Sequence, residues 1–192
     1  MIPIFAGSIA VIAIGVSRFT KLRREVNELN TFVDRWKNAP AGTESSSFKS
    51  SAKIGPNVAD DMVHIFDNDQ PAHTAAVESC ESIGRQHIYN LEAGLGTLAT
   101  LSAAIPLLGF LGTVTGMIKA FMQIQKLGGN VNANVLAGGI WEALVTTAAG
   151  LAVGIVALVI HNYLAEQVRT SARLIEHTGE ITVKILGNND ED

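Results

Sequence analysis

Charged residues and cysteine are both scarce in this sequence of 192 residues. Only 17% of the residues are charged and 47% are hydrophobic, whereas about 25% of the residues of a soluble domain are charged. The single cysteine, Cys80, excludes an intramolecular disulfide and a metal cluster held by several thiolates. The formal net charge of -4 offers no basic surface for nucleic acid, so we expect no nucleic-acid partner. These absences indicate an integral membrane protein.

Three apolar runs are candidates for helices that cross a bilayer, and such a helix needs about 20 residues. Residues 99–118 contain no charge, and Glu142 is the only charged residue in 135–160. The first run, 2–16, is shorter, and its positive charges follow it rather than precede it. We therefore interpret it as a first span and not as a cleaved signal peptide. The predicted fold is all-α, with three transmembrane helices per chain and long helices that extend into the cytoplasm.

Basic residues predict the orientation of the spans, because short segments rich in Lys and Arg stay in the cytoplasm. Such residues follow the first run (Arg18, Lys21, Arg23, Arg24) and the third (Arg169, Arg173). The amino terminus is then periplasmic and the carboxyl terminus cytoplasmic. The predicted order is a transmembrane helix at 1–17, a cytoplasmic helical section at 18–92, a second span at 93–122, a periplasmic hairpin at 123–134, a third span at 135–163 and a cytoplasmic tail at 164–192.

The cytoplasmic section contains two helical patterns and a polar stretch between them. Residues 39–53 include Pro40, Gly42 and five serines, a composition typical of a linker. From residue 72 onward no break is evident before the second span, so we expect one continuous helix there. Four potential metal ligands are close in sequence (His64, Asp67, Asp69, His73), but their spacing fits no established pattern. A solvated acidic turn is favoured over a metal site.

Polar side chains within the second and third runs form the candidate site, because polar groups in hydrocarbon are costly and face a bundle interior or a watery cavity. Thr146 follows Glu142 on the same helix face, and Gly150 and Gly154 extend that row. The second run carries a stripe of small residues around one hydroxyl, and such a face permits close helix approach. The stripe consists of Pro106, Gly109, Thr113, Gly116 and Ala120. Two interpretations of Glu142 stay open: a role on an ion path, or a structural carboxylate that reaches headgroups or pairs between subunits.

These two segments resemble the MotA/TolQ/ExbB proton channel family. The resemblance is carried by IPLLGFLGTVTG at 105–116 and IWEALVTTAAGL at 140–151, and it is strong over about 98–162. Three spans are similar to the ExbB and TolQ branch, since MotA proteins have four. The resemblance implies the bacterial inner membrane, a pentameric ring of this chain among membrane lipids, and a dimer of a single-span partner similar to ExbD, TolR or MotB that supplies a transmembrane aspartate.

The resemblance also implies roles for individual residues. By position, Thr113 and Thr147 match the family's two pore-lining threonines, and Glu142 matches its third-helix glutamate. Thr146 stands where proton-driven members have alanine or glycine and sodium-driven stators have threonine. A transient sodium site at Thr113, Thr146 and Thr147 is therefore open, although the proton is the commoner ion of the family. No resident cofactor or metal is implied beyond the transported H⁺ or Na⁺.

The function implied is that of a channel or stator subunit in a rotary motor driven by a proton or sodium gradient. A non-conducting scaffold that assembles around a single-span partner is the alternative, with Glu142 and the threonines only bonding subunits together. An intramembrane enzyme would need a nucleophile with a base, or paired aspartates, within the spans, and the sequence has neither. We therefore expect no enzymatic activity.

Overall fold

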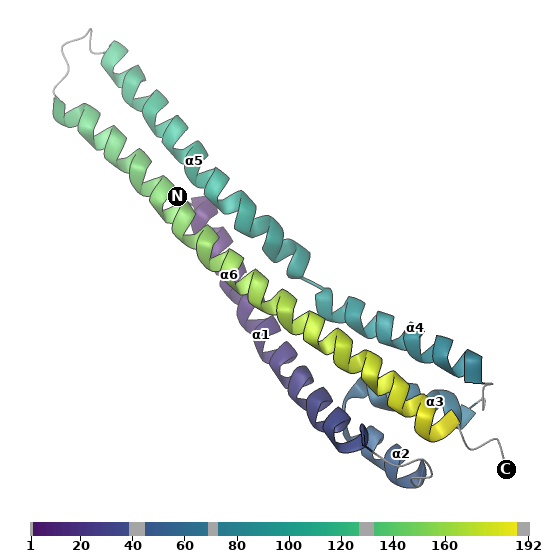
Figure 1. Cartoon of the computed structure of the whole chain (residues 1–192). Helices are drawn as coiled ribbons and strands as arrows, with labels where there is room; N and C mark the ends of the chain where they lie inside the picture. Colours follow the sequence, from purple (N-terminus) through teal and green to yellow (C-terminus); the bar gives the residue numbers. More distant parts are fainter. Residues whose placement is uncertain (1, 39–44, 69–72, 127–132, 188–192) are drawn as a thin grey trace. The chain divides into compact units, whose positions relative to one another are not determined.

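The computed structural model describes residues 2–38, 45–68, 73–126 and 133–187, and these fold into helices without strands (Figure 1). The helices are α1 (Ile2–Trp36), α2 (Ser45–Ile54), α3 (Asn57–Asn68), α4 (His73–Glu92), α5 (Leu95–Lys126) and α6 (Ala133–Leu186). The all-α prediction is confirmed. Three regions are long and apolar enough to cross a membrane by length and composition: Pro3–Trp36 in α1, Thr74–Lys126 over α4 and α5, and Leu136–Leu186 in α6.

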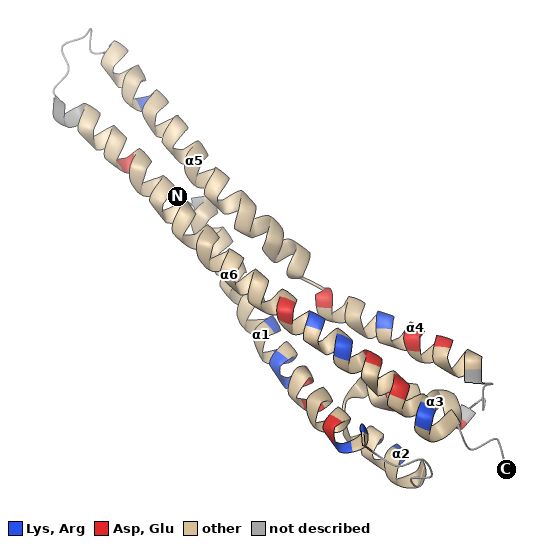
Figure 2. Cartoon of the chain, in the orientation of Figure 1, with Lys and Arg blue, Asp and Glu red and all other residues tan. Residues whose placement is uncertain are grey.

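The chain divides into two compact units. We call Met1–Ser17 with Gly94–Tyr163 the apolar unit, and Arg18–Ala93 with Leu164–Asp192 the polar unit. Figure 2 shows that charged residues gather on the helices of the polar unit and are sparse along α5 and the first half of α6. The separation by charge reflects the cost of placing charges in hydrocarbon.

Large apolar side chains cover the outside of the apolar unit. Ile9 of α1 and Leu107 of α5 are each 68% exposed, and Trp141 of α6 is 71% exposed. Such a surface would be unfavourable in water, because soluble monomers rarely expose large contiguous apolar patches. It is the surface expected of helices that face lipid or neighbouring membrane helices.

α4 and α5 are separate helices, so the expectation of one continuous helix from residue 72 is wrong. α4 ends at Glu92, and Gly94 has a φ of 85°. Glycine adopts this left-handed conformation without the clash that a Cβ would cause, and it commonly ends helices. The amide of Leu98 then donates to the carbonyl of Gly94 at 3.1 Å in the first turn of α5. The apolar periodicity concealed this break because it continues on both sides of it.

Residues 45–53 are helical, so the predicted linker at 39–53 is wrong over this part; residues 39–44 lie outside the described residues. Phe48 of α2 is fully buried. Its ring centroid lies 5.2 Å from that of Trp36, edge to face, and 5.6 Å from that of Phe32. The burial of this aromatic side chain outweighs the weak helix propensity of the surrounding serines.

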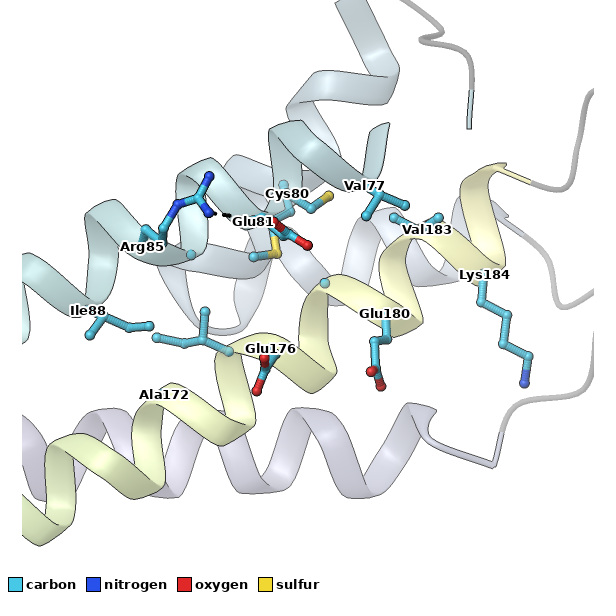
Figure 3. Close-up of a pocket in the computed structure, with 14 residues that line it drawn as sticks. Val77, Cys80, Glu81, Arg85, Ile88, Ala172, Glu176, Glu180, Val183 and Lys184 are labelled. Atoms are coloured by element: carbon cyan, nitrogen blue, oxygen red, sulfur yellow. Dashed lines mark ion pairs between the residues drawn. The ribbon is translucent and has the colours of Figure 1, made fainter. Parts of the chain in front are cut away.

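A groove of about 840 Å³ lies along α4 and α6 within the polar unit (Figure 3). Gly84 of α4 permits close packing there, because a Cβ at this position would lie 3.1 Å from Cγ2 of Ile175. Cys80 contributes to the groove lining but is only 3% exposed. Burial raises the pKa of its thiol to about 11. The thiol is therefore protonated and unreactive at neutral pH.

Acidic and imidazole side chains do not gather into a ligand set anywhere in the described residues, where no group of three or more His, Cys, Asp or Glu could hold a metal. His64 lies 3.8 Å from the carboxylate of Asp60, one turn away on α3. Asp67 pairs instead with Lys49 of α2. Asp69 and the side chain of His73 lie outside the described residues.

Candidate functional site

α5 and α6 meet backbone to backbone at two glycines. A Cβ built on Gly109 would lie 3.1 Å from the Cα of Gly150, and a Cβ built on Gly150 would lie 2.8 Å from the Cα of Gly109. Backbone therefore meets backbone at this point, as at small-residue contacts between membrane helices. Any side chain at either position has to push the helices apart.

Further contacts of the same kind show that the two helices are antiparallel. A Cβ on Gly116 would lie 2.9 Å from the Cβ of Ala143, and a Cβ on Gly139 would lie 2.9 Å from the Cβ of Ala120. As the residue number on α5 rises, the number of the α6 residue that it contacts therefore falls. Figure 1 shows α5 and α6 running alongside each other over this length.

The sequence analysis named six small or ring-bearing packing residues, and the structure places all of them in this contact: Pro106, Gly109, Gly116, Ala120, Gly150 and Gly154. The ring of Pro106 lies against Gly154. Because Pro106 has no amide hydrogen, the carbonyl of Ser102 loses its helix donor, and this oxygen is 3.3 Å from the position of a Cβ on Gly154. The sequence analysis missed Gly112 and Gly139, although each stands four residues from another small contact residue.

A hydrogen bond between the helices connects two of the predicted ion-path residues. The hydroxyl of Thr147 donates to the carbonyl of Gly109 at 2.9 Å. In an α-helix the same carbonyl accepts the amide of Thr113, four residues on. Thr113 in turn donates its hydroxyl to the carbonyl of Phe110 at 2.6 Å. Both threonines are half-buried, and the lone pairs of their hydroxyl oxygens remain as acceptors.

Thr146 is enclosed by the helix contact. The side chain is 7% exposed, and its hydroxyl donates to the carbonyl of Glu142 at 2.8 Å. Its methyl carbon, rather than its hydroxyl, is the atom nearest to the position of a Cβ on Gly112. Thr146 therefore fills the space that Gly112 leaves and bonds its own helix backbone, as lone threonines in membrane helices often do.

Glu142 lies on a different flank of α6 from Thr147. Five residues separate the two, which corresponds to a rotation of about 140° around the helix. The third helix of the unit provides a reference, because a Cβ on Gly15 of α1 would lie 3.1 Å from Cγ2 of Ile160. Ile160 follows Glu142 by 18 residues, or about five full turns, so Glu142 has nearly the same angular position around α6 as Ile160. The Thr147 hydroxyl reaches the turn of α5 that precedes Thr113, whereas Glu142 is exposed and lies about 140° around α6 from Thr147.

These features define the class of the protein: a multi-pass membrane protein whose α5–α6 hairpin carries hydroxyls at a close helix contact. The model of the MotA/TolQ/ExbB proton channel family matches residues 49–177. The chain belongs to this family, as the sequence analysis predicted, and it is a multi-pass protein of the inner membrane. Its relatives place it with the ExbB-like members.

Three relatives illustrate the extent of the likeness. The chain is 42% identical to the biopolymer transport protein ExbB of Pseudomonas putida over 79 residues, 41% of this chain and 24% of that protein. It is 36% identical over 94 residues to exbB1 of Vibrio cholerae, 49% of this chain and 40% of that protein. It is 38% identical over 93 residues to ExbB of Salmonella typhimurium, 48% of this chain and 36% of that protein. The chain thus spans two fifths or less of the length of these relatives.

Proposed function

We propose that this chain is the ion-conducting subunit of a membrane motor, a channel and stator protein of the ExbB-ExbD or TolQ-TolR type. The observation that carries the proposal is the bond from the Thr147 hydroxyl to the Gly109 carbonyl. It holds Thr147 beside the turn of α5 that bears Thr113. Two half-buried hydroxyl oxygens then share one flank of a hairpin that lies within the family match.

The chemistry of these hydroxyls suits ion transfer. Each hydroxyl gives its hydrogen to a backbone carbonyl, so each oxygen offers lone pairs outward. Such an oxygen accepts a hydrogen bond from water or from a protonated carboxylic acid, and it also binds a hard cation. A threonine hydroxyl does not titrate near neutral pH, so a proton path needs an acid from elsewhere.

We therefore propose that a partner supplies this acid. The partner is a dimer of a single-span protein with a transmembrane aspartate, of the ExbD, TolR or MotB kind, enclosed by a pentamer of this chain in the bilayer. The flank of the α5–α6 hairpin that carries Thr113 and Thr147, on the side away from Glu142, would face the partner. We propose no resident cofactor, no metal site and no enzymatic activity for the chain.

The proton is the ion that the geometry favours. A sodium site would draw on the hydroxyls of Thr113, Thr146 and Thr147 together. Thr146 is enclosed at 7% exposure, and its methyl group occupies the gap beside Gly112. The hydroxyl oxygen of Thr146 therefore does not lie on the flank that carries Thr113 and Thr147. Sodium remains the alternative that the experiment below tests.

A non-conducting scaffold is the second candidate, because one observation favours it. All three threonine hydroxyls are bonded to backbone carbonyls, an arrangement that helix packing alone explains. In a scaffold the hairpin would hold its single-span partner without passing ions.

Ion flux separates these functions. The chain and its partner are reconstituted in liposomes, and a proton gradient or a sodium gradient is imposed separately, with Thr146→Ala measured alongside. We expect proton flux that Thr146→Ala changes by less than about twofold. Sodium flux abolished by Thr146→Ala would establish the sodium motor instead. An assembled complex without flux of either ion would favour the scaffold.

A further inference from the structure

Four basic residues follow the first apolar run of α1: Arg18, Lys21, Arg23 and Arg24. Arg24 is neutralised by the chain itself, because its Nε lies 2.7 Å from a carboxylate oxygen of Glu28. The ion pairs between described residues include none of the other three. An anion from outside the chain can therefore bind to Arg18, Lys21 or Arg23 without displacing a carboxylate.

The guanidinium of Arg23 points back toward the apolar run. Its Cζ lies 5.9 Å from the centroid of the Phe19 ring, one turn nearer to the amino terminus. Phe19 follows Val16, the last residue of the run, by about 4.5 Å along the helix axis. Headgroups occupy about 5–8 Å on each side of the hydrocarbon core of a bilayer. With the run in the hydrocarbon, the guanidinium therefore lies at the depth of the lipid phosphates.

The same face of α1 carries an apolar row. Its members are exposed and recur every three or four residues: Phe5, Ile9, Ile12 and Val16. At about 100° per residue, these four together with Phe19 and Arg23 fall within an arc of about 80° around the helix. A lipid whose acyl chain lies along the row would therefore have its headgroup beside Arg23.

We propose that this face of α1 binds an anionic phospholipid. The forked guanidinium of Arg23 donates two N–H groups to the headgroup phosphate, a geometry that arginine favours, and the apolar row contacts an acyl chain. Arg18 and Lys21 lie about 140° and 160° from Arg23 around the helix, so they add to the positive potential rather than to this contact. The predicted orientation of α1 places the lipid in the cytoplasmic leaflet.

Charge complementarity selects an anionic lipid over a zwitterionic one. A zwitterionic headgroup brings its own ammonium group, whereas α1 already supplies three positive charges that lack a carboxylate partner among the described residues. Each basic residue near a membrane surface strengthens binding to anionic lipid about fivefold. Orientation of the span, by contrast, requires only the charges and not a guanidinium held over Phe19.

Lipid binding to the full chain tests this site. Phosphatidylglycerol or phosphatidylcholine with matched acyl chains is titrated into the purified protein in detergent, and native mass spectrometry measures the lipid bound per chain. We expect phosphatidylglycerol to bind at least about fivefold more tightly. Arg23→Gln should weaken that binding about fivefold, whereas Arg23→Lys, which keeps the charge, should retain most of it. Equal affinity of the unsubstituted chain for the two lipids would overturn the proposal.

Arg35→Gln is the matched control. Arg35 also lies on α1 with its guanidinium over an aromatic ring, 5.8 Å from the centroid of Trp36, and no ion pair between described residues includes it. It follows Val16 by about 28 Å along the axis, which is beyond the headgroups. Arg35→Gln should therefore leave phosphatidylglycerol binding unchanged. A loss equal to that in Arg23→Gln would show that net charge alone attracts the lipid, and would overturn the site.

Two further measurements exclude misfolding and a free anion. In phosphatidylcholine nanodiscs Arg23→Gln should keep the midpoint of thermal unfolding, because Arg23 is exposed. In phosphatidylglycerol nanodiscs only the unsubstituted chain should gain stability, because a ligand of the folded state stabilises it. Inorganic phosphate should not displace the lipid in the titration. Displacement would assign Arg23 to a free anion and would overturn the lipid site.

The lipid site and the proposed ion conduction fail in different ways, because they use different helices. Selective binding of phosphatidylglycerol in a complex without ion flux would keep the site and reject conduction. Ion flux in a chain that binds both lipids equally would keep conduction and reject the site.

Discussion

The Thr147 hydroxyl donates to the Gly109 carbonyl across the contact between α6 and α5, at 2.9 Å. Gly109 is also the residue whose Cα would lie 2.8 Å from a Cβ on Gly150 of the opposite helix. A backbone-to-backbone contact and a hydrogen bond between these two helices therefore meet at one residue. A displacement of the helices at this contact would move the hydroxyl of Thr147, so packing and the proposed ion path depend on each other.

Gly150→Ala should destabilise the protein, whereas Gly138→Ala should not. A methyl group on Gly150 meets the backbone of Gly109, and overpacking of this kind costs about 1–3 kcal/mol. Gly138 lies on the same helix with no atom within 4 Å of its Cβ position, and replacing a helical glycine by alanine gains about 0.5–1 kcal/mol. Thermal unfolding of the two variants in nanodiscs measures the difference. Equal midpoints would contradict the close contact.

Thr147→Val should abolish most ion flux, and Thr147→Ser should retain it. Valine keeps the shape but removes the hydroxyl, so the Gly109 carbonyl loses a bond with a net contribution of about 1 kcal/mol. Flux into liposomes, measured beside the amount of assembled complex, separates lost conduction from lost folding. Thr115→Val is the control, because its exposed hydroxyl bonds only its own helix and lies about 160° from Thr113. Normal flux in Thr147→Val would remove this residue from the ion path.

The Cys80 thiol should react slowly in the folded protein. Burial raises its pKa to about 11, and an unfolded thiol has a pKa of about 8.5, so the folded state holds over 100-fold less thiolate at pH 8. Maleimide labelling at pH 8, with and without denaturant, measures the ratio.

The raised pKa also predicts the pH dependence of stability. The fold favours the neutral thiol, so this contribution to stability is fully present below the pKa of the unfolded thiol and is lost as the pH rises toward 11.

The labelling experiment has a matched control. Ser82→Cys in a Cys80→Ser background supplies an exposed thiol on α4 that should label at the unfolded rate. Equal labelling of Cys80 in folded and unfolded protein would contradict its burial.

Accessibility of introduced cysteines tests the predicted orientation. Lys126→Cys, at the end of α5, should label from outside intact cells with a membrane-impermeant maleimide in a Cys80→Ser background. Arg169→Cys should label only after the inner membrane is opened, because basic segments that flank a span stay in the cytoplasm. The reverse pattern would invert the orientation of all three spans.

Several features of the fold were readable from the sequence because they depend on single helices. The apolar runs follow from the absence of charge in 99–118 and from the presence of a single charged residue, Glu142, in 135–160, because charge is costly at any position along a helix in hydrocarbon. The small residues around Gly109 and Gly150 followed from helical spacing alone. The helical state of 45–53 did not, because the burial of Phe48 against Trp36 depends on a residue outside that segment. The end of α4 at Glu92 was also missed, since it depends on the φ of Gly94.

The sequence by itself determined that hydroxyls and one carboxylate occupy the middle of two apolar helices, because composition and spacing within each run are sufficient for that. Only the tertiary structure decided which neighbours each of these groups contacts. Thr147 bonds α5, Thr146 is enclosed beside Gly112, and Glu142 is exposed. The reason is physical: a periodic pattern defines the face of one helix, whereas the rotation and register of two helices depend on which backbone positions lack a side chain where they meet.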